Sequence, residues 1–146
     1  MNNIEECSIL LVDDEIQLLY MIKEILHNEG FKKIYTASSC SEAIDKYNKE
    51  KPDIIVLDVM LSDGDGFSIL KKIRHESNVP VLFLSAKDED ESRLLGLGLG
   101  ADDYITKPFL PKELILRLKG VLRRTYSNSL NTEHNNKKPV TNSWKY

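Results

Sequence analysis

Short apolar runs alternate along the chain with segments of helical periodicity. Five of these runs are continuous rather than alternating in polarity, and they occupy residues 8–12, 33–37, 53–57, 80–85 and 103–106. Continuous apolarity over so few residues is typical of strands that are buried on both faces of a parallel sheet. We therefore predict five strands at these positions.

The segments between the runs place apolar side chains at helical spacing. We expect five helices, which begin near residues 15, 39, 66, 88 and 110. The first stops at Gly30, a residue that readily ends a helix, and the second opens with Ser39 and Glu42 at capping-box spacing. Pro111 provides the first helical position of the fifth.

This order of elements places the chain in the α/β class. Five strand–helix units joined by right-handed crossovers form a doubly wound sheet with helices on both faces. We predict a flavodoxin-like (βα)5 fold, in which a five-stranded parallel sheet has the strand order 2-1-3-4-5.

The composition changes after Arg124. Residues 127–146 are rich in Asn, Ser, Thr and Lys and contain few large aliphatic side chains, so they cannot bury enough apolar surface to offset the entropy of ordering. We expect one domain over residues 1–126 and a flexible linker over residues 127–146. Trp144 and Tyr146 do not suit a linker, and we interpret them as the start of a further domain.

Composition and charge limit the function classes. The 146 residues are 41% apolar and 29% charged, and no apolar run approaches the ~20 residues of a membrane span. The N-terminus has no basic flank typical of a secretory signal, so we expect a cytoplasmic location and no membrane partner. The net charge of −3 includes +2 from residues 127–146, which leaves −5 over residues 1–126. A domain with a net negative charge lacks the basic surface that binds DNA phosphates. Contact with DNA is therefore expected only through a further domain.

A glycine pattern near the fourth helix raises the question of a nucleotide site. Gly96, Gly98 and Ala101 fit the spacing G-x-G-x-x-A of dinucleotide-binding folds. That motif acts where a strand turns directly into a helix, whereas an acidic helical segment precedes Gly96. We therefore interpret these glycines as a weakly held helix end.

Polar side chains interrupt the apolar runs at the point where the strands end. The residues at these positions are Asp13, Asp14, Asp58, Ser85 and Lys107. The carboxyl ends of parallel strands meet at one edge of a sheet, and the first and third strands are neighbours in the predicted order. Three carboxylates so close together predict either a raised, coupled titration or a bound metal, and all-oxygen ligation favours Mg²⁺. A metal beside a carboxylate and a lysine suits phosphoryl transfer, with Asp58 as the candidate nucleophile.

Four stretches of the sequence resemble the receiver domain of bacterial two-component response regulators. They are "ILLVDDE", "DIIVLDVMLSDGDGFSILKKIR", "PVLFLSA" and "GADDYITKPF", within residues 4–126. The resemblance implies a signalling phosphoacceptor rather than an enzyme, in which Asp58 receives the phosphoryl group of a histidine kinase. The Mg²⁺ ligands that it implies are Asp13, Asp14, Asp58 and the backbone carbonyl of Met60.

The same resemblance assigns roles to the fourth and fifth strand ends. Ser85 would hydrogen-bond to one phosphoryl oxygen, and Lys107 would pair with another. Ser85 and Tyr104 resemble the switch pair of the family, in which Tyr104 rotates inward after phosphorylation. The peptide bond between Lys107 and Pro108 is expected to be cis, as in relatives.

The ending of the domain resembles the OmpR/PhoB subfamily, whose members dimerise through the fourth helix, fifth strand and fifth helix. Because such an interface is isologous, each contact between protomers occurs twice. The charged pairs that the resemblance implies are Arg93 with Glu113, Asp103 with Arg117, and Asp102 with Arg124.

Three functions stay open on the sequence. The first is the receiver of a transcription factor whose winged-helix DNA-binding domain begins around Trp144, and the second is a stand-alone receiver that acts in a phosphorelay or by binding a protein. The third is a flavodoxin-like protein or an aspartyl-phosphate phosphatase. Such a phosphatase needs a second Asp at position 60, which is Met here, and Asp13-Asp14-Glu15 would repel a flavin phosphate.

Overall fold

The computed structural model describes residues 3–86 and 90–126. Within them, five parallel strands form one sheet in the order β2-β1-β3-β6-β7. These strands are β1 (Ser8–Val12), β2 (Lys33–Ala37), β3 (Ile54–Leu57), β6 (Val81–Ser85) and β7 (Asp103–Thr106). The predicted order 2-1-3-4-5 is confirmed, because β6 and β7 are the fourth and fifth strands of this sheet.

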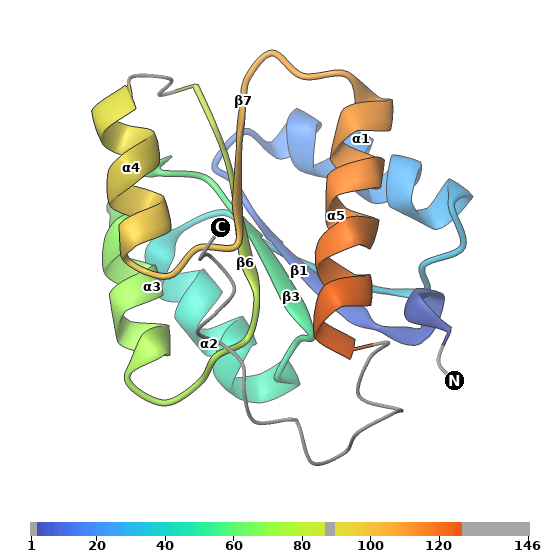
Figure 1. The fold of residues 1–146 in the computed structure, drawn as a ribbon, viewed down its shortest axis with the longest axis horizontal. Helices are drawn as coiled ribbons and strands as arrows, with labels where there is room; N and C mark the ends of the chain where they lie inside the picture. The colour runs from blue at the N-terminus through green and yellow to red at the C-terminus, as the bar shows by residue number, and fades with distance from the viewer. Residues whose placement is uncertain (1–2, 87–89, 127–146) are drawn as a thin grey trace.

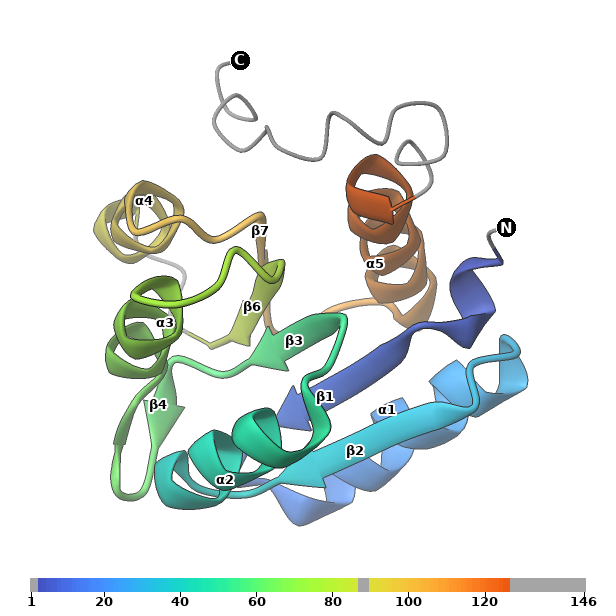
Figure 2. The same cartoon turned by 90° about the horizontal axis from the view of Figure 1, so that it is seen from below.

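Helices cover both faces of the sheet (Figures 1 and 2). They are α1 (Ile16–Asn28), α2 (Cys40–Glu50), α3 (Gly66–Arg74), α4 (Asp90–Gly98) and α5 (Pro111–Tyr126), and a 3-10 turn, η1 (Ile4–Glu6), precedes β1. The helices α1 and α5 lie on one face, and α2, α3 and α4 lie on the other. None of the helices within the described residues combines the length and the hydropathy that a bilayer span requires.

The continuous apolar runs supply two separate cores. Ile9 and Leu11 of β1 pack with α1 and α5, whereas Leu10 and Val12 pack with α2 and α3. Successive side chains of a strand point to opposite faces, so a strand buried on both faces needs apolar residues at every position. All five residues of β1 and of β6 are buried, as the sequence predicts for a central strand.

Most helix ends match their sequence signals. The Ser39 hydroxyl caps α2 by accepting a hydrogen bond from the Glu42 amide, and Gly30, with φ of 105°, follows the end of α1. Leu110, immediately before α5, is 70% exposed. The start predicted near Asp88 lies outside the described residues, within which α4 begins at Asp90.

A short hairpin follows β3 and was not predicted. It consists of the antiparallel strands β4 (Met60–Leu61) and β5 (Gly64–Asp65). The Asp63 carboxylate at its tip accepts hydrogen bonds from the backbone amides of Cys40 at 2.7 Å and Ser41 at 3.2 Å. The hairpin therefore joins the end of β3 to the first turn of α2.

Candidate functional site

The backbone hydrogen bonds between neighbouring strands continue for one residue beyond the strand ends. They fix the position of three residues with polar side chains. The amide of Asp13 donates to Ala37, that of Asp58 donates to Val12, and that of Lys107 donates to Ser85, at 2.8–3.1 Å. These bonds place Asp13, Asp58 and Lys107 side by side at the carboxyl edge of the sheet. This is the edge at which the sequence had predicted the site.

Three carboxylates meet there. Asp13, Asp14 and Asp58 each offer an oxygen atom, and these atoms all lie within 4.8 Å of one another. Asp13 is 3% exposed and Asp58 is 6% exposed, whereas Asp14 faces solvent. The cluster therefore has two buried carboxylates and one open side.

Lys107 joins the two buried carboxylates. Its Nζ atom lies 2.9 Å from Asp13 Oδ2, 3.4 Å from Asp58 Oδ2 and 4.0 Å from Glu15 Oε1. When the three clustered carboxylates are ionised, Lys107 offsets one of their three negative charges. The net charge of −2 that remains would be balanced by one divalent cation. The peptide bond between Lys107 and Pro108 is cis.

The surroundings of Asp58 perturb its titration. Burial and the neighbouring Asp13 raise the pKa of the Asp58 carboxyl, while Lys107, the Ser85 hydroxyl and the Met60 amide oppose that rise only in part. Burial alone would lower the pKa of the Lys107 ammonium, but its hydrogen bond to Asp13 and the nearby carboxylate charges raise it. A carboxyl with a raised pKa beside a protonated lysine is an arrangement typical of functional sites.

The cluster has the chemistry of a Mg²⁺ site. Hard divalent cations prefer carboxylate oxygens, and Mg²⁺ commonly takes one or two of them while it keeps several waters. Asp13, Asp14 and Asp58 supply such oxygens, and the exposure of Asp14 leaves room for water ligands. The residues present therefore fit the metal that the sequence predicts.

Gly66 allows the backbone to pass close to Asp58. A Cβ atom at position 66 would collide with the backbone oxygen of Asp58 and would crowd Leu57 and Phe83. The amide of Gly66 donates to the Val59 carbonyl at 2.7 Å, which closes the loop after β3. The first residue of α3 is thus constrained by the segment that carries Asp58.

The two predicted switch residues lie on adjacent strands. Ser85 is 1% exposed and its hydroxyl hydrogen-bonds to the Asp58 carboxylate. Tyr104 is 4% exposed, and its ring centroid lies 5.7 Å from that of Phe83. Tyr104 therefore already occupies a buried position in this structure.

The profile of the response regulator receiver domain matches residues 9–119. This chain belongs to that family. The receiver resembles the transcriptional regulatory protein YvrH of Bacillus subtilis (strain 168), with 48% identity over 122 residues that cover 84% of this chain and 52% of the relative. It is also 48% identical over 118 residues to the alkaline phosphatase synthesis transcriptional regulatory protein PhoP of the same organism, covering 80% of this chain and 49% of the relative. The chain thus spans about half the length of these two relatives.

Solved receivers share the fold. A two-component response regulator from Clostridium difficile has a TM-score of 0.79 and 36% identity, with 83% of this chain and 99% of that chain covered. The BeF3-activated N-terminal receiver domain of Klebsiella pneumoniae RstA has a TM-score of 0.75 and 30% identity, covering 80% of this chain and 98% of that chain. The sequence-based assignment to response regulator receivers is therefore confirmed.

The residues predicted for a dimer interface lie on α4, β7 and α5, apart from Asp102, which lies in the turn before β7. Arg117 contacts two acidic residues of its own chain, Asp103 at 2.8 Å and Glu113 at 3.4 Å. Arg93 and Arg124 are exposed. One chain contains no interface between protomers, so the three charged pairs stay predictions.

Arg74 is a residue whose role the sequence did not indicate. Its guanidinium donates to the backbone carbonyls of Ser77, Val79 and Gly100 at 2.8–3.2 Å. The same group lies 3.6 Å from Asp102, whose carboxylate also accepts a hydrogen bond from the Val81 amide. These contacts tie the end of α3 to the turn before β7. Gly100 and Asp102 are distant from Arg74 in the sequence, so no local pattern could have revealed these two contacts.

Proposed function

We propose that this receiver is the phosphoacceptor of a two-component system and that Asp58 receives the phosphoryl group. The observation that carries the proposal is the position of Asp58, a buried carboxylate in contact with Lys107 and clustered with Asp13 and Asp14. The donor would be the phosphohistidine of a cognate sensor kinase. Family membership supports this partner.

The transfer that we propose is a single displacement at phosphorus. An Asp58 oxygen forms the new bond, the bond from phosphorus to the histidine nitrogen breaks, and the imidazole leaves neutral with a proton on its other nitrogen. Lys107 pairs with one oxygen of the transferred group, and the Ser85 hydroxyl donates to another. A Mg²⁺ ion bound by Asp13, Asp14, Asp58 and the Met60 carbonyl would neutralise negative charge on that group. Later attack by water on phosphorus breaks the bond to the Asp58 oxygen, which releases inorganic phosphate and returns Asp58 to its carboxylate form.

Phosphorylation by a small donor tests this function directly. With Mg²⁺ and phosphoramidate, intact-mass spectrometry is expected to show one added phosphoryl group per chain. Chelation of the metal with EDTA is expected to prevent the addition, because the carboxylate cluster then repels the anionic donor. An unmodified mass at saturating donor and Mg²⁺ would contradict the proposal.

The proposed response to phosphorylation is a shift between two arrangements of α4 and β7. Ser85 already contacts Asp58, and Tyr104 is already buried against Phe83, so both side chains have access to the arrangement that phosphorylation would favour. A phosphoryl group bound by Ser85 and Lys107 would increase the population of that arrangement. The affected face comprises α4, β7 and α5.

This face is the proposed dimer interface. Leu94, Leu97 and Leu116 expose 41–68% of their surface on α4 and α5, and charged residues lie on the same elements. The charged pairs proposed between protomers are Arg93 with Glu113, Asp103 with Arg117, and Asp102 with Arg124. Formation of the second pair requires Arg117 to exchange an intramolecular contact for an intermolecular one.

Charge reversal at Glu113 is expected to weaken the dimer. Two copies of one exposed pair are lost and replaced by repulsion, so we expect a roughly tenfold increase in the dimer Kd of the beryllofluoride form, measured by analytical ultracentrifugation. The control Lys112→Glu changes a neighbouring exposed residue outside the proposed pairs and is expected to have little effect. Combining Glu113→Arg with Arg93→Glu is expected to restore dimerisation. A double variant as weak as the single one would rule out this pair.

The output that we propose for the whole protein is transcriptional. Both relatives described above are named transcriptional regulators, and the present chain spans about half their length. In this proposal residues 1–126 are the receiver, residues 127–146 are a linker, and a further domain contacts DNA. A stand-alone receiver is the alternative, and the reading frame of the gene beyond Tyr146 distinguishes the two.

A further inference from the structure

Arg74, the last residue of α3, joins two turns at the amino-terminal edge of the sheet. One turn leads from α3 into β6, and the other leads from α4 into β7. The guanidinium donates to the Val79 carbonyl of the first turn and to the Gly100 carbonyl of the second, both at 2.8 Å. Asp58 follows β3 at the carboxyl edge of the sheet, so the proposed phosphoryl transfer makes no use of these contacts.

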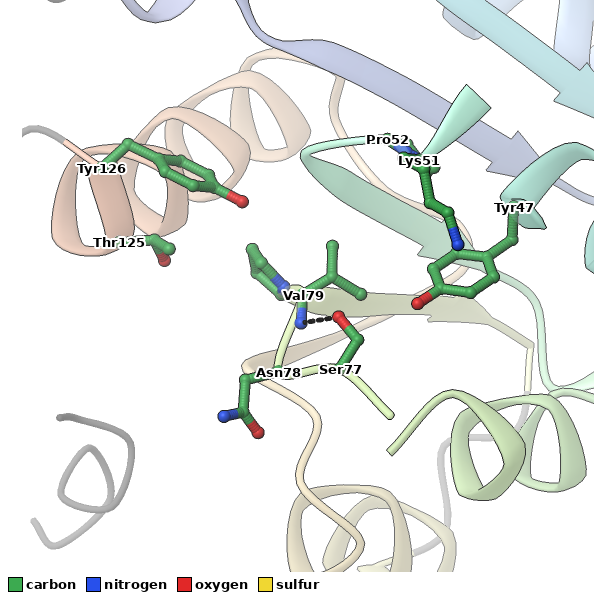
Figure 3. A pocket seen from close by; sticks show the side chains of 9 residues that line it. Tyr47, Lys51, Pro52, Ser77, Asn78, Val79, Thr125 and Tyr126 are labelled. Carbon is green, nitrogen blue, oxygen red and sulfur yellow. Dashed lines mark hydrogen bonds between the residues drawn. The ribbon is translucent and has the colours of Figure 1, made fainter. Parts of the chain in front are cut away.

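The first turn is also held by hydrogen bonds of its own. The Ser77 hydroxyl accepts a hydrogen bond from the Val79 amide at 3.0 Å (Figure 3), and the Ser77 amide donates to the Ile73 carbonyl at 2.9 Å. Ser77 offers its backbone carbonyl to Arg74 at 3.2 Å. Because Arg74 and this turn are fixed to each other, they form a stable base for the second turn.

The second turn fits closely against Arg74. Gly100 has a φ of 105°, in the left-handed region that other residues rarely adopt, and a Cβ atom there would lie 3.0 Å from Arg74 Nε. Glycine therefore lets the backbone approach the guanidinium and present its carbonyl to it. The position of the turn before β7 is thus set in part by a residue of α3.

Asp102, two residues after Gly100, uses one carboxylate oxygen in these contacts. Its Oδ1 atom accepts a hydrogen bond from the Val81 amide at 3.0 Å and lies 3.6 Å from the Arg74 guanidinium. The Asp102 amide donates to the Val81 carbonyl at 2.7 Å, so both the backbone and the side chain of Asp102 are held. The side chain still exposes 29% of its surface. The Oδ2 atom therefore remains for a further cation.

Arg124 can supply that cation in a dimer. It is exposed in the last turn of α5. Burial raises the pKa of the Asp102 carboxyl, and the Val81 amide, Arg74 and Arg124 oppose that rise. An effect of Arg124 within one chain indicates that it lies on the same side of the molecule as Asp102, as both residues must in an isologous interface.

We propose that Arg74 is a positioning residue of the dimer interface, which orients Asp102 toward Arg124 of the second protomer. Arg74 itself lies on α3, outside the face formed by α4, β7 and α5. A carboxylate that is already oriented loses less conformational freedom when the pair forms, so the same contact gives a tighter dimer. This role rests on the proposed dimerisation, because the pair of Asp102 with Arg124 belongs to that interface.

Arg74→Gln tests this role in the full 146-residue chain. We expect a roughly tenfold increase in the dimer Kd of the beryllofluoride form, measured by analytical ultracentrifugation, because both copies of the oriented pair are weakened. Labelling by phosphoramidate and Mg²⁺ is expected to match wild type, since the contacts of Arg74 lie at the opposite edge of the sheet from Asp58. The control Lys72→Gln removes an exposed charge two residues earlier on α3 and is expected to dimerise like wild type.

Two outcomes of this experiment are distinct. If wild type dimerises with beryllofluoride and Arg74→Gln dimerises equally well, Arg74 does not position the interface, and the proposed dimer stands. If wild type itself stays monomeric with beryllofluoride, the proposed dimer is refuted and the role of Arg74 with it.

A double-mutant cycle with Arg124 separates orientation of Asp102 from a general loss of stability. Arg124→Gln removes the proposed partner of Asp102, so the further change Arg74→Gln is expected to alter the dimer Kd by less than about twofold. An equal increase in both backgrounds would show that Arg74 acts on the fold alone, which would overturn the proposal.

Arg74→Lys provides a milder variant for the same cycle. Lysine keeps the positive charge but lacks the planar fork that binds both turns, so the dimer Kd is again expected to rise, and only while Arg124 is present. If Arg74→Gln does not fold, Arg74→Lys takes its place. A wild-type Kd in Arg74→Lys would then overturn the proposal.

Discussion

Asp58→Asn is expected to abolish phosphoryl transfer to the receiver. The amide cannot provide the carboxylate oxygen that attacks phosphorus, whereas its size leaves the packing of β3 and Gly66 unchanged. With phosphoramidate and Mg²⁺, the variant is expected to keep its unmodified mass under conditions that label wild type fully. Intact-mass spectrometry over a time course measures the difference.

A matched control separates loss of the acceptor from loss of charge. Asp45 is an exposed carboxylate on α2, remote from the site, so Asp45→Asn is expected to be labelled like wild type. Two other carboxylates, Asp13 and Asp14, lie beside position 58. They are the nearest alternative acceptors of the phosphoryl group in Asp58→Asn. Labelling of Asp58→Asn at the wild-type rate would show that Asp58 is not the acceptor.

Asp58→Asn is also expected to change the stability of the folded protein. Burial and Asp13 raise the pKa of Asp58 in the folded protein, so folding disfavours its ionised form. The stability that this group contributes is present below its unfolded pKa and is lost as the pH rises through its folded pKa. In EDTA at neutral pH, Asp58→Asn should therefore unfold at higher denaturant concentration than wild type. The difference in denaturant midpoint between Asp58→Asn and wild type should become smaller as the pH falls through the raised pKa of Asp58.

The parts of the fold that the sequence predicted are those with a local physical cause. A strand buried on both faces must be apolar at every position, so its limits are visible as the first polar residue, as at Asp13 and Asp58. In the predicted order 2-1-3-4-5 the first and third strands are neighbours, and the carboxyl ends of parallel strands share one edge, which brings Asp13, Asp58 and Lys107 together. Spacing and topology were therefore sufficient to locate the candidate site.

The features that the sequence missed depend on contacts between distant loops. The hairpin of β4 and β5 has strands of two residues, too short for a hydrophobic period, and Asp63 looks like any turn residue until α2 is placed beside it. Arg74 binds carbonyl groups, which every residue carries, so no side-chain pattern marks its partners. Asp102 had been paired with Arg124 of a second protomer, and its proximity to Arg74 became visible only in three dimensions.

Lys107→Met is expected to slow phosphorylation by small donors by roughly 10²-fold to 10³-fold, the effect of removing one electrostatic donor from an active site. The ammonium lies 3.4 Å from Asp58 Oδ2, within reach of a phosphoryl group formed there, and methionine keeps the length of the side chain without the charge. Lys107 also lowers the pKa of Asp58, so its loss raises that pKa further and leaves less of the nucleophilic carboxylate. The rate is measured by intact-mass spectrometry at saturating Mg²⁺.

Lys107→Met is expected to bind Mg²⁺ more tightly than wild type, although it is phosphorylated more slowly. Lys107 offsets one carboxylate charge of the cluster, so Lys107→Met leaves a more negative site, and its Kd for Mg²⁺ should fall. Lys107→Arg keeps a positive charge and should show Mg²⁺ affinity closer to wild type, as measured by titration calorimetry. Slower transfer together with tighter metal binding separates a role on the phosphoryl group from simple loss of the folded site, in which both properties would decline. If Lys107→Met is phosphorylated at the wild-type rate, the ammonium does not stabilise the transferred group.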